Sequence, residues 1–433
     1  MPERALEVAR ELCAFIDACP TPFHACAEIG ARLEQAGFTR LAEGEPWPAA
    51  RDGGARHYVI RGGSLAAWAE PEGREPARAW RVAGAHTDSP NLRLKPRADT
   101  GRAGVRQLGV EVYGGVLLNS WLDRDLALAG RCFVRGPGAP LERRFALERP
   151  LVRVPQLAIH LNREIATEGL HLNPQLHLNP VLAVDTGGEP GVRELIAHAL
   201  ALAPEDLLSW DAMLHDAQPA RLIGLDDQFV SAPRLDNLCS CFCALGGLLA
   251  RLARREPLRL VAGLAFFDHE EVGSTSARGA ESAFLADVLE RSVHARGGGR
   301  EEFLRAIAGS VCLSADMAHA THPNYPEKHE PDHPVRLNGG PAIKTNVNQR
   351  YASEAESEAY FLAACERAGV PFQRYAHRGD MPCGSTIGPL TAAALGMRTV
   401  DVGNPQLAMH SARELCGAHD PWRLARAMEA FFE

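Results

Sequence analysis

Three features that would assign this chain to other functional classes are missing from its sequence. Basic residues are not in surplus, because 46 Lys and Arg stand against 54 Asp and Glu, which gives a net charge of −8. Such a chain is a poor candidate for binding nucleic acid or an anionic membrane, although a small pocket on it can still be positive. There is no run of about 18 uncharged apolar residues, the length that spans a bilayer. The N-terminus carries Glu3, Glu7, Glu11 and Asp17 where a leader would have a basic start and an apolar run. We therefore expect neither a nucleic-acid partner nor a membrane partner.

The cysteines are not spaced for a structural zinc site. Three of the 11 cysteines, Cys239, Cys241 and Cys243, lie in an apolar segment typical of a helix. Cysteines two and four residues apart on a helix do not form a tetrahedral zinc knot. We interpret them as small buried residues of a reducing compartment and expect a cytoplasmic protein.

The apolar pattern changes twice along the 433 residues, a length at which two or three domains are expected. Residues 97–225 contain short β-type segments broken by Gly and Pro, which favours a separate β-rich domain. The flanking segments combine helices with continuous apolar strands, a pattern typical of a mostly parallel sheet covered on both faces. We predict one α/β domain formed by residues 1–96 and 226–433, with residues 97–225 inserted into it. The expected strands are 79–86, 258–267, 310–316 and 397–403, and the expected helices are 4–18, 22–36, 238–254, 353–369 and 421–432.

Two of these helices carry start signals. Thr21 is suited to cap the helix at 22–36, and Pro22 suits the first helical position. Ser353 and Glu356 have the spacing of a capping box for the helix at 353–369.

Side chains of the types that bind metals follow the predicted strands. His86 ends the first strand, residues 268–271 (Asp-His-Glu-Glu) follow the second, and Asp316 follows the third. Asp236 opens the apolar helix, and His410 lies in the loop after the last strand. Open α/β sheets bind ligands at the carboxyl ends of their strands, so this placement predicts that these residues converge.

Each of these segments also has an ordinary interpretation on its own. A histidine two residues before an aspartate, as in His86 and Asp88, is common by chance. Asp236 can be a simple helix cap, and His410 can be an exposed loop histidine. The adjacent Glu270 and Glu271 are harder to explain, because two neighbouring carboxylates at a buried strand end repel each other unless a cation lies between them.

A pair of metal ions accounts for the whole set. Mixed histidine and carboxylate ligands suit zinc, cobalt or manganese. Two such ions about 3.5–4 Å apart, bridged by a carboxylate and a water, are a known device for hydrolysis. An economical division places one of the two glutamates on a metal and its neighbour on the water.

Seven ordered motifs resemble those of the M18 metallopeptidases, the aspartyl aminopeptidases. The resemblance runs from about residue 20 to the C-terminus. Its motifs are HTDSPNLRLKP, RLDNL, DHEEVGS, SADMAHA with HPNY, GPAIKTNVNQRYAS, MPCGSTIGP and MHSARE.

This resemblance implies a role for each matching residue. It implies two zinc ions per subunit, or cobalt or manganese in their place, with Asp236 bridging them and Glu270 as general base. Asp88 would orient His86, and His160 would reach into the active site of a neighbouring subunit. Lys344 would face the acidic side chain of the substrate. The metal ligands implied are His86, Asp236, Glu271, Asp316 and His410, and the substrate-binding residues implied are His160, His319, Lys344 and Tyr351.

The resemblance also implies a fold, an assembly and an activity. The expected fold is an α/β zinc-peptidase domain with an inserted β-rich dimerisation domain, and the expected assembly is a homo-oligomer, a dodecamer built from dimers. The expected activity is removal of N-terminal Asp or Glu from peptides. Two alternatives stay open: a two-metal aminopeptidase or deacylase of broader specificity, and a self-assembling shell protein without catalysis.

Overall fold

The computed structural model describes residues 2–49, 54–73 and 75–433. The chain divides into two compact units. The first contains the residues up to Asp88, Ala220–Met409 and Glu414–Glu433, and the second contains Ser89–Pro219 with His410–Arg413. The β-rich segment expected at 97–225 thus falls in a unit that starts earlier, because its first strand begins at Asn91, directly after the His86 motif.

A nine-stranded mixed sheet forms the centre of the first unit. Its strands are β1 (Thr39–Arg40), β2 (Arg56–Arg61), β3 (Ser64–Ala69), β4 (Trp80–His86), β13 (Val261–Phe267), β14 (Val311–Ala315), β16 (Ala342–Thr345), β17 (Gln373–Ala376) and β18 (Arg398–Gly403). They are ordered β1-β2-β3-β13-β4-β14-β18-β16-β17. The central strands β13, β4, β14 and β18 are parallel, whereas β3 and β16 join them antiparallel. The predicted mixed, mostly parallel sheet is confirmed.

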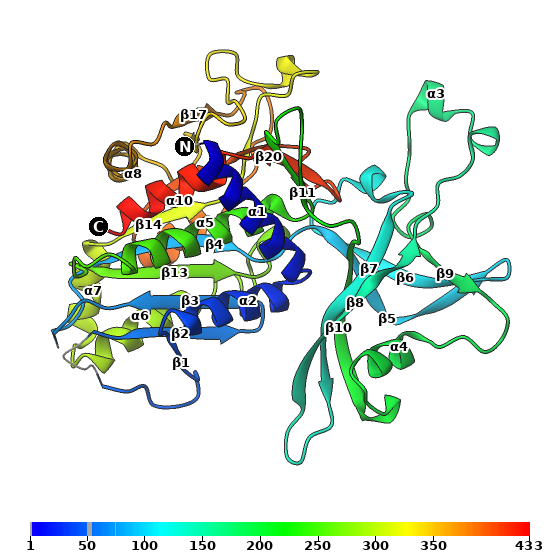
Figure 1. Ribbon diagram of the computed structural model, residues 1–433, viewed down its shortest axis with the longest axis horizontal. Coiled ribbons are helices and arrows are strands. Elements are labelled where there is room, and N and C mark those ends of the chain that lie inside the picture. The colour runs from blue at the N-terminus through cyan, green and yellow to red at the C-terminus, as the bar shows by residue number, and fades with distance from the viewer. Residues whose placement is uncertain (1, 50–53, 74) are drawn as a thin grey trace. The chain divides into compact units, whose positions relative to one another are not determined.

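Helices cover both faces of this sheet. Side chains alternate between the faces along a strand: on β13, Leu264 and Phe266 join one apolar core, and Ala265 and Phe267 join the other. Figure 1 shows α1, α5 and α10 lying across one face. The helices of that core are α1 (Pro2–Ala18), α2 (Pro22–Gln35), α5 (Leu235–Leu252), α8 (Ala355–Ala368) and α10 (Asp420–Phe431). Those of the opposite core are α6 (Phe284–Ala295), α7 (Arg300–Ala308) and α9 (Ile387–Leu395).

The two predicted start signals have different outcomes. Thr21 caps α2 by accepting a hydrogen bond from the backbone of His24, and Pro22 is the first residue of the helix. The capping box predicted from Ser353 was wrong: Glu354 caps α8, and Ser357 is its partner. The hydroxyl of Ser353 instead accepts the backbone N–H of Asp401, 2.9 Å away.

Helix α5 has the length and apolar composition of a membrane-spanning helix, and by these alone it could cross a bilayer. The sequence criterion of an uncharged apolar run did not identify it, because the segment contains Asp236 and Arg251. However, 78% of its 18-residue window is buried inside the protein, where it packs beneath the sheet as a core helix. Cys239, Cys241 and Cys243 are among its buried residues, and all eleven cysteines are free thiols.

A smaller sheet lies in the same unit, in the order β11-β12-β20-β19-β15. Its strands are β11 (Arg221–Ile223), β12 (Phe229–Ala232), β15 (Ala318–His319), β19 (Pro405–Leu407) and β20 (Glu414–Gly417). It joins the segment after Asp316 to the segment before His410 through the pairing of β15 with β19.

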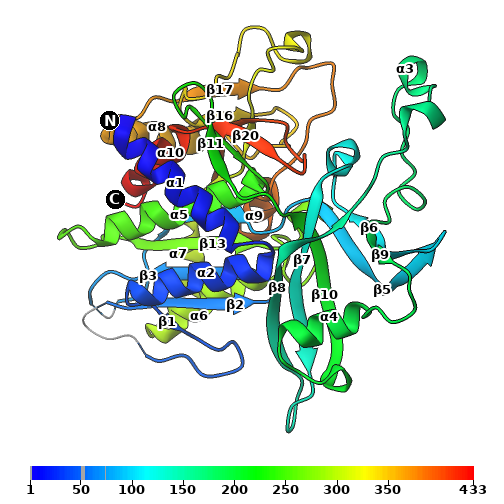
Figure 2. The same cartoon turned by 45° about the vertical axis from the view of Figure 1, so that its right-hand side comes forward.

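The second unit is a closed barrel in the order β10-β5-β6-β9-β8-β7. Its strands are β5 (Asn91–Arg102), β6 (Val105–Tyr113), β7 (Asp125–Val134), β8 (Leu141–Arg153), β9 (Val181–Val184) and β10 (Leu207–Asp216). Leu92, Leu108, Leu128 and Phe145 contribute to its interior. Helix α4 (Val192–Ala199) packs against this core through Val192 and Ile196 and is labelled beside the barrel in Figure 2.

Candidate metal centre

Strand order brings three of the predicted ligand segments to one edge of the large sheet. β4 lies between β13 and β14, and all three are parallel, so their carboxyl ends point the same way. The register pairs Phe267 with His86, so the segment that starts at Asp268 leaves the sheet beside His86. Asp316 leaves the sheet on the other side of β4, directly after β14.

The His86 imidazole lies at the centre of the resulting cluster. Its Nε2 is 3.2 Å from Asp236 Oδ1, 3.6 Å from Asp316 Oδ1 and 4.0 Å from Glu270 Oε2. Among the described residues, two groups offer ligand atoms that all lie within 4.8 Å of one another. They are His86 with Glu270 and Asp316, and His86 with Asp236 and Glu271. The structure therefore brings together four of the five predicted ligands and the predicted general base.

Crowded carboxylates in a buried place shift the proton affinities of this cluster. Burial raises the pKa of Glu270 to about 8, and the negative charges of Asp316, Asp88 and Asp236 act in the same direction. Burial alone would lower the pKa of His86, but the surrounding carboxylates outweigh it and raise that pKa well above its usual value. A cluster in which one imidazole faces several carboxylates is suited to a cation.

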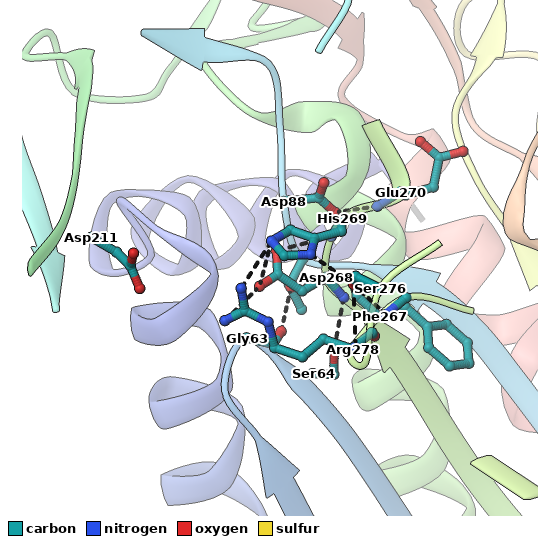
Figure 3. Close-up of polar contacts among 12 residues, drawn as sticks. Gly63, Ser64, Asp88, Asp211, Phe267, Asp268, His269, Glu270, Ser276 and Arg278 are labelled. Carbon is teal, nitrogen blue, oxygen red and sulfur yellow. Dashed lines mark hydrogen bonds and ion pairs between the residues drawn. The ribbon is translucent and has the colours of Figure 1, made fainter. Parts of the chain in front are cut away.

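Asp88 contacts both His86 and the turn that carries the glutamates. Its backbone carbonyl accepts a hydrogen bond from His86 Nδ1 at 3.0 Å, closer than its own carboxylate oxygen at 3.4 Å. Because a carbonyl only accepts, the Nδ1 carries the proton and Nε2 is left to face the cluster. The Asp88 carboxylate accepts the backbone N–H of Glu270 at 3.2 Å (Figure 3). It also accepts the backbone N–H of Glu271 at 3.2 Å.

Asp236 is more than the simple helix cap that its position allowed. The cap position of α5 is Arg234, and Asp236 has non-helical backbone angles within the first turn. The peptide bond from Asp236 to Asn237 is cis. The Asp236 N–H donates to Glu414 Oε2 at 3.0 Å, and the Asn237 side chain donates to the carbonyl of Ala315 at 2.8 Å. These bonds hold the start of α5 against β20 and β14 and direct the carboxylate of Asp236 toward His86.

His410 belongs to the second unit, with residues 410–413. There, its Nδ1 lies 3.0 Å from the carbonyl oxygen of Gly115, and its own carbonyl accepts the N–H of Leu117. His410 is in neither ligand group found among the described residues. Its assignment as a metal ligand stays a prediction.

Comparison with known proteins identifies the family. A family model described as "Aminopeptidase I zinc metalloprotease (M18)" matches residues 15–432. The chain belongs to the M18 family of zinc metalloproteases. It is 50% identical over 426 residues to "Probable M18 family aminopeptidase 2" of Streptomyces coelicolor, covering 98% of this chain and 97% of the relative. The protein of the same description from Mycobacterium leprae is 50% identical over 428 residues, with 98% of each chain covered.

Solved structures agree with this assignment. The cryo-EM structure of the Ape4 and Nbr1 complex contains a chain with a TM-score of 0.95 and 36% identity, which covers 99% of this chain and 86% of that one. The crystal structure of prApe1 gives a TM-score of 0.92 at 28% identity, with 99% and 94% covered. Membership of the M18 family makes the chain a zinc-dependent aminopeptidase, and the predicted fold and family are confirmed.

Three of the four residues expected to contact substrate in this M18 protein, His319, Lys344 and Tyr351, lie close to Asp316 or to Lys344. The fourth, His160, belongs to the second unit. Lys344 Nζ is 3.6 Å from Asp316 Oδ2, donates to the carbonyl of Met317 at 3.3 Å, and lies 5.0 Å from the centre of the Tyr351 ring. Its side chain is 2% exposed, so Lys344 is not the solvent-exposed strand lysine that alternation alone suggests. Burial, together with the charge of Lys344, lowers the pKa of His319 to about 4, which keeps that ring neutral at physiological pH.

Two buried carboxylates near the site were missed from the sequence. Glu414 accepts the Asp236 N–H, as described above. Asp401, on β18, accepts the Ser314 hydroxyl at 2.5 Å, the Thr386 hydroxyl at 2.7 Å and the N–H of Ala352 at 2.6 Å. It therefore ties β14 and the start of α9 to the residue after Tyr351. The available signal was an aspartate in the middle of the apolar strand MRTVDVG.

Proposed function

We propose that this chain removes Asp and Glu from the N-termini of peptides and that it uses two zinc ions to do so. The observation that carries the proposal is the pair of ligand groups that share His86, with the buried ammonium of Lys344 beside Asp316. The His86 Nε2 can bind one ion, but the two groups also contain four carboxylates, more donors than a single four-coordinate zinc ion takes. This surplus supports a second ion, and a fixed cation supports an acidic substrate side chain.

The donor set fits zinc. Imidazole nitrogen and carboxylate oxygen are ligands that zinc takes in catalytic sites. We assign His86, Asp236, Glu271, Asp316 and His410 as the ligands, with Asp236 between the two ions. Bound zinc would polarise the scissile carbonyl and acidify a water molecule.

Glu270 is suited to be the general base. It belongs to one ligand group through its proximity to His86 and Asp316, yet its side chain keeps 15% of its surface accessible. A carboxylate whose pKa is raised by burial accepts a proton from water more readily than an ordinary glutamate. Glu270 would take the proton of the attacking water and pass it to the leaving amine.

Lys344 would set the preference for acidic residues. Its ammonium is held by the Met317 carbonyl and stacked on Tyr351, so it can face a substrate carboxylate without first being ordered. A charge-assisted hydrogen bond contributes roughly 1.5–3 kcal/mol, enough for a preference of one to two orders of magnitude. The neutral His319 could donate a further hydrogen bond to the bound peptide.

His160 would complete the site from another subunit. It lies between Ile159 and Leu161, which are 57% and 74% exposed, and Leu157, three positions before it, is 60% exposed. Exposed apolar residues in such number mark protein contacts. The structure titled "S. cerevesiae mApe1 dodecamer" is similar to this chain at 27% identity and a TM-score of 0.84. We infer a homo-oligomer, with a dodecamer built from dimers as its form, in which His160 hydrogen-bonds the developing oxyanion of a neighbouring site.

Hydrolysis of Asp-, Glu-, Leu- and Ala-anilides with and without a chelator tests the proposal. We expect the acidic substrates to be cleaved fastest and the chelator to stop all cleavage. Equal rates on Leu-anilide would instead indicate an aminopeptidase of broader specificity. Cleavage of N-acyl substrates but of no anilide would indicate a deacylase. No turnover by the zinc-loaded protein would indicate a shell protein without catalysis.

A Lys344→Ala variant tests the origin of the preference. The ratio of kcat/KM for Asp over Leu should fall by about ten- to a hundredfold, as loss of a charged hydrogen bond predicts. Lys328→Ala is the matched control, because Lys328 is an exposed lysine of the same unit. An unchanged ratio in Lys344→Ala would remove Lys344 from this role.

A further inference from the structure

The motif that contains Glu270 and Glu271 begins with two ionisable residues that the metal centre does not use. Asp268 and His269 precede the glutamates, and neither is in a ligand group found among the described residues. Figure 3 shows both beside Ser276 and Arg278, with the side chain of Glu270 directed away from them. These four residues, Asp268, His269, Ser276 and Arg278, are called the bracing network below.

The hydrogen bonds of the His269 ring determine where its proton lies. Arg278 Nη2 is 2.9 Å from Nε2, and His269 Nδ1 is 2.7 Å from Ser276 Oγ. Because a guanidinium only donates, Nε2 accepts and the proton is on Nδ1, from which it is donated to Ser276. Ser276 Oγ also accepts the N–H of Arg278 at 3.3 Å and the N–H of Gly279 at 3.1 Å.

Asp268 connects this ring to the sheet. Its carboxylate lies 3.4 Å from Arg278 Nη1 and accepts the N–H of His269 at 2.9 Å. Its own N–H donates to Ser64 Oγ at 2.8 Å, and that hydroxyl donates to the carbonyl of Arg278 at 2.7 Å. Asp268 is 1% exposed, so this arrangement is a buried ion pair and not a surface contact. Ser64, at the start of β3, therefore holds both ends of the segment 268–278.

The space around Asp268 is closed. A Cβ atom on Gly63 would lie 2.4 Å from Asp268 Oδ2, so the carboxylate fills the place where that side chain would be. A Cβ atom on Gly279 would lie 1.9 Å from the carbonyl oxygen of Ser274. Both glycines permit close packing that a larger residue would disrupt.

The segment that the network encloses is a turn with an unfavourable backbone. His269 has φ 67°, in the left-handed region that non-glycine residues seldom adopt, and a 3-10 turn, Glu270–Val272, follows it at once. Surrounding contacts must hold such a residue in place. On the side of the metal ligands, the Asp88 carboxylate accepts the two glutamate N–H groups. On the other side, the bracing network holds the ring and backbone of His269.

We propose that the bracing network is a positioning device for catalysis: it fixes the left-handed turn at His269, so that the Glu270 carboxylate is held where it can reach the attacking water. The inference rests on the proposed role of Glu270 as general base. Displacement of a catalytic group by about 1 Å can reduce turnover about a hundredfold. Loss of the network should therefore lower kcat and leave KM nearly unchanged, because none of its members is expected to contact the substrate.

Two variants remove members of the network, and one of them, Ser276→Ala, leaves volume and charge nearly unchanged. Ser276→Ala removes the hydroxyl that accepts from His269 and from two backbone groups, and His269→Ala removes the ring. Each should lower kcat about ten- to a hundredfold at unchanged zinc content. In metal-free protein, each should also speed amide hydrogen exchange in the segment 268–279. His269→Gln should restore most of the activity, because its amide can accept from Arg278 and donate to Ser276. Thr275→Ala is the matched control, since Thr275 is exposed on the same segment.

A double-mutant cycle separates positioning from general stability. If the network acts through Glu270, His269→Ala should have no further effect on the residual activity of Glu270→Gln. The proposal would be overturned if His269→Ala lowered kcat by the same factor in the wild-type and Glu270→Gln backgrounds. It would also be overturned if the network variants had a lowered melting temperature but wild-type kcat and unchanged amide hydrogen exchange. High activity of Glu270→Gln alone would instead reject the proposed function, and the network would then have no general base to position. If Glu270→Gln has a low kcat but His269→Ala and Ser276→Ala turn over at the wild-type rate, only the positioning role of the bracing network is rejected.

Discussion

Loading the metal centre with zinc should release protons, because its residues hold protons that metal binding must displace. In the absence of metal, the carboxylates around His86 raise its pKa well above the usual value, which favours the imidazolium form. Glu270, with a pKa raised by burial to about 8, also holds a proton at that pH. A histidine must be neutral to bind a metal, and a general base must be ionised to act.

The size of the effect follows from these two groups. At pH 7, a group with a pKa of about 8, such as Glu270, is roughly nine-tenths protonated. The raised pKa of His86 also favours its protonated form at this pH. Nearby divalent cations favour the deprotonated form of both groups. Filling the centre should therefore release about one proton from Glu270 and up to one more from His86. Apparent zinc affinity should therefore increase as the pH is raised toward 8, by up to about two orders of magnitude per pH unit.

Isothermal titration calorimetry of zinc into metal-free protein measures this release. Titrations at pH 7 in PIPES and in HEPES differ in enthalpy by the number of protons released times the difference in buffer ionisation enthalpy. Glu270→Gln is the matched control, because it removes the Glu270 proton and leaves the assigned ligands in place. Its release should be smaller by about one proton at the same zinc stoichiometry.

Two results would refute this reasoning. An enthalpy independent of the buffer would mean that the centre is already deprotonated, which contradicts the electrostatic balance between His86 and its carboxylates. A release that Glu270→Gln leaves unchanged would mean that Glu270 carries no proton before zinc binds.

Three further changes have defined outcomes. Metal-free protein should lose stability as the pH rises from about 4.5 to about 8, because the pKa of Glu270 is higher in the folded than in the unfolded chain. The raised pKa of His86 has an effect of the same sign above pH 6.5. Thermal unfolding should show a loss of up to about 1.4 kcal/mol in the free energy of unfolding per pH unit for each group. Asp401→Asn would place an amide NH2 donor opposite the Ala352 N–H or one of the two hydroxyls that now donate to the carboxylate. Urea unfolding should therefore show a loss of about 1–3 kcal/mol in the free energy of unfolding. An Asn variant as stable as the wild type would contradict the hydrogen bonds assigned to Asp401. A His160→Phe chain mixed with a Glu270→Gln chain should regain part of the activity if His160 acts across subunits, and no recovery in verified mixed oligomers would count against that role.

The parts of the fold that follow from short-range pattern could be predicted. The strand that ends at His86 and the strand before Asp268 are continuous apolar runs because both faces of the sheet are covered, and such runs are visible in the sequence. Their polar ends could be located for the same reason. The Thr21 cap was also predictable, because the capping residue and the bond it makes lie within three positions.

The residues that hold the site in place were beyond such patterns because their partners are far away in the chain. Glu414 lies 178 positions from Asp236, and Asp88 lies 182 positions from Glu270. No local periodicity relates such pairs, which meet only once the strand order is known. The mistaken capping box at Ser353 has the same origin: its hydroxyl is engaged by Asp401, 48 positions away, so the adjacent Glu354 caps the helix.

Register explains why one motif serves two sides of the sheet edge. The last residue of β13, Phe267, packs into the core of α6, α7 and α9 and is paired with His86, so the backbone reaches the sheet edge level with the histidine. From there the left-handed turn at His269 separates the side chains: Asp268 stays buried against Arg278, while Glu270 and Glu271 join His86 in the two ligand groups. A shift of one residue in this register would exchange the two faces. It would place an aromatic ring among the ligands and the carboxylates in an apolar core. The sheet pairing and the metal centre therefore depend on the same few residues, and a substitution that weakens one should weaken the other.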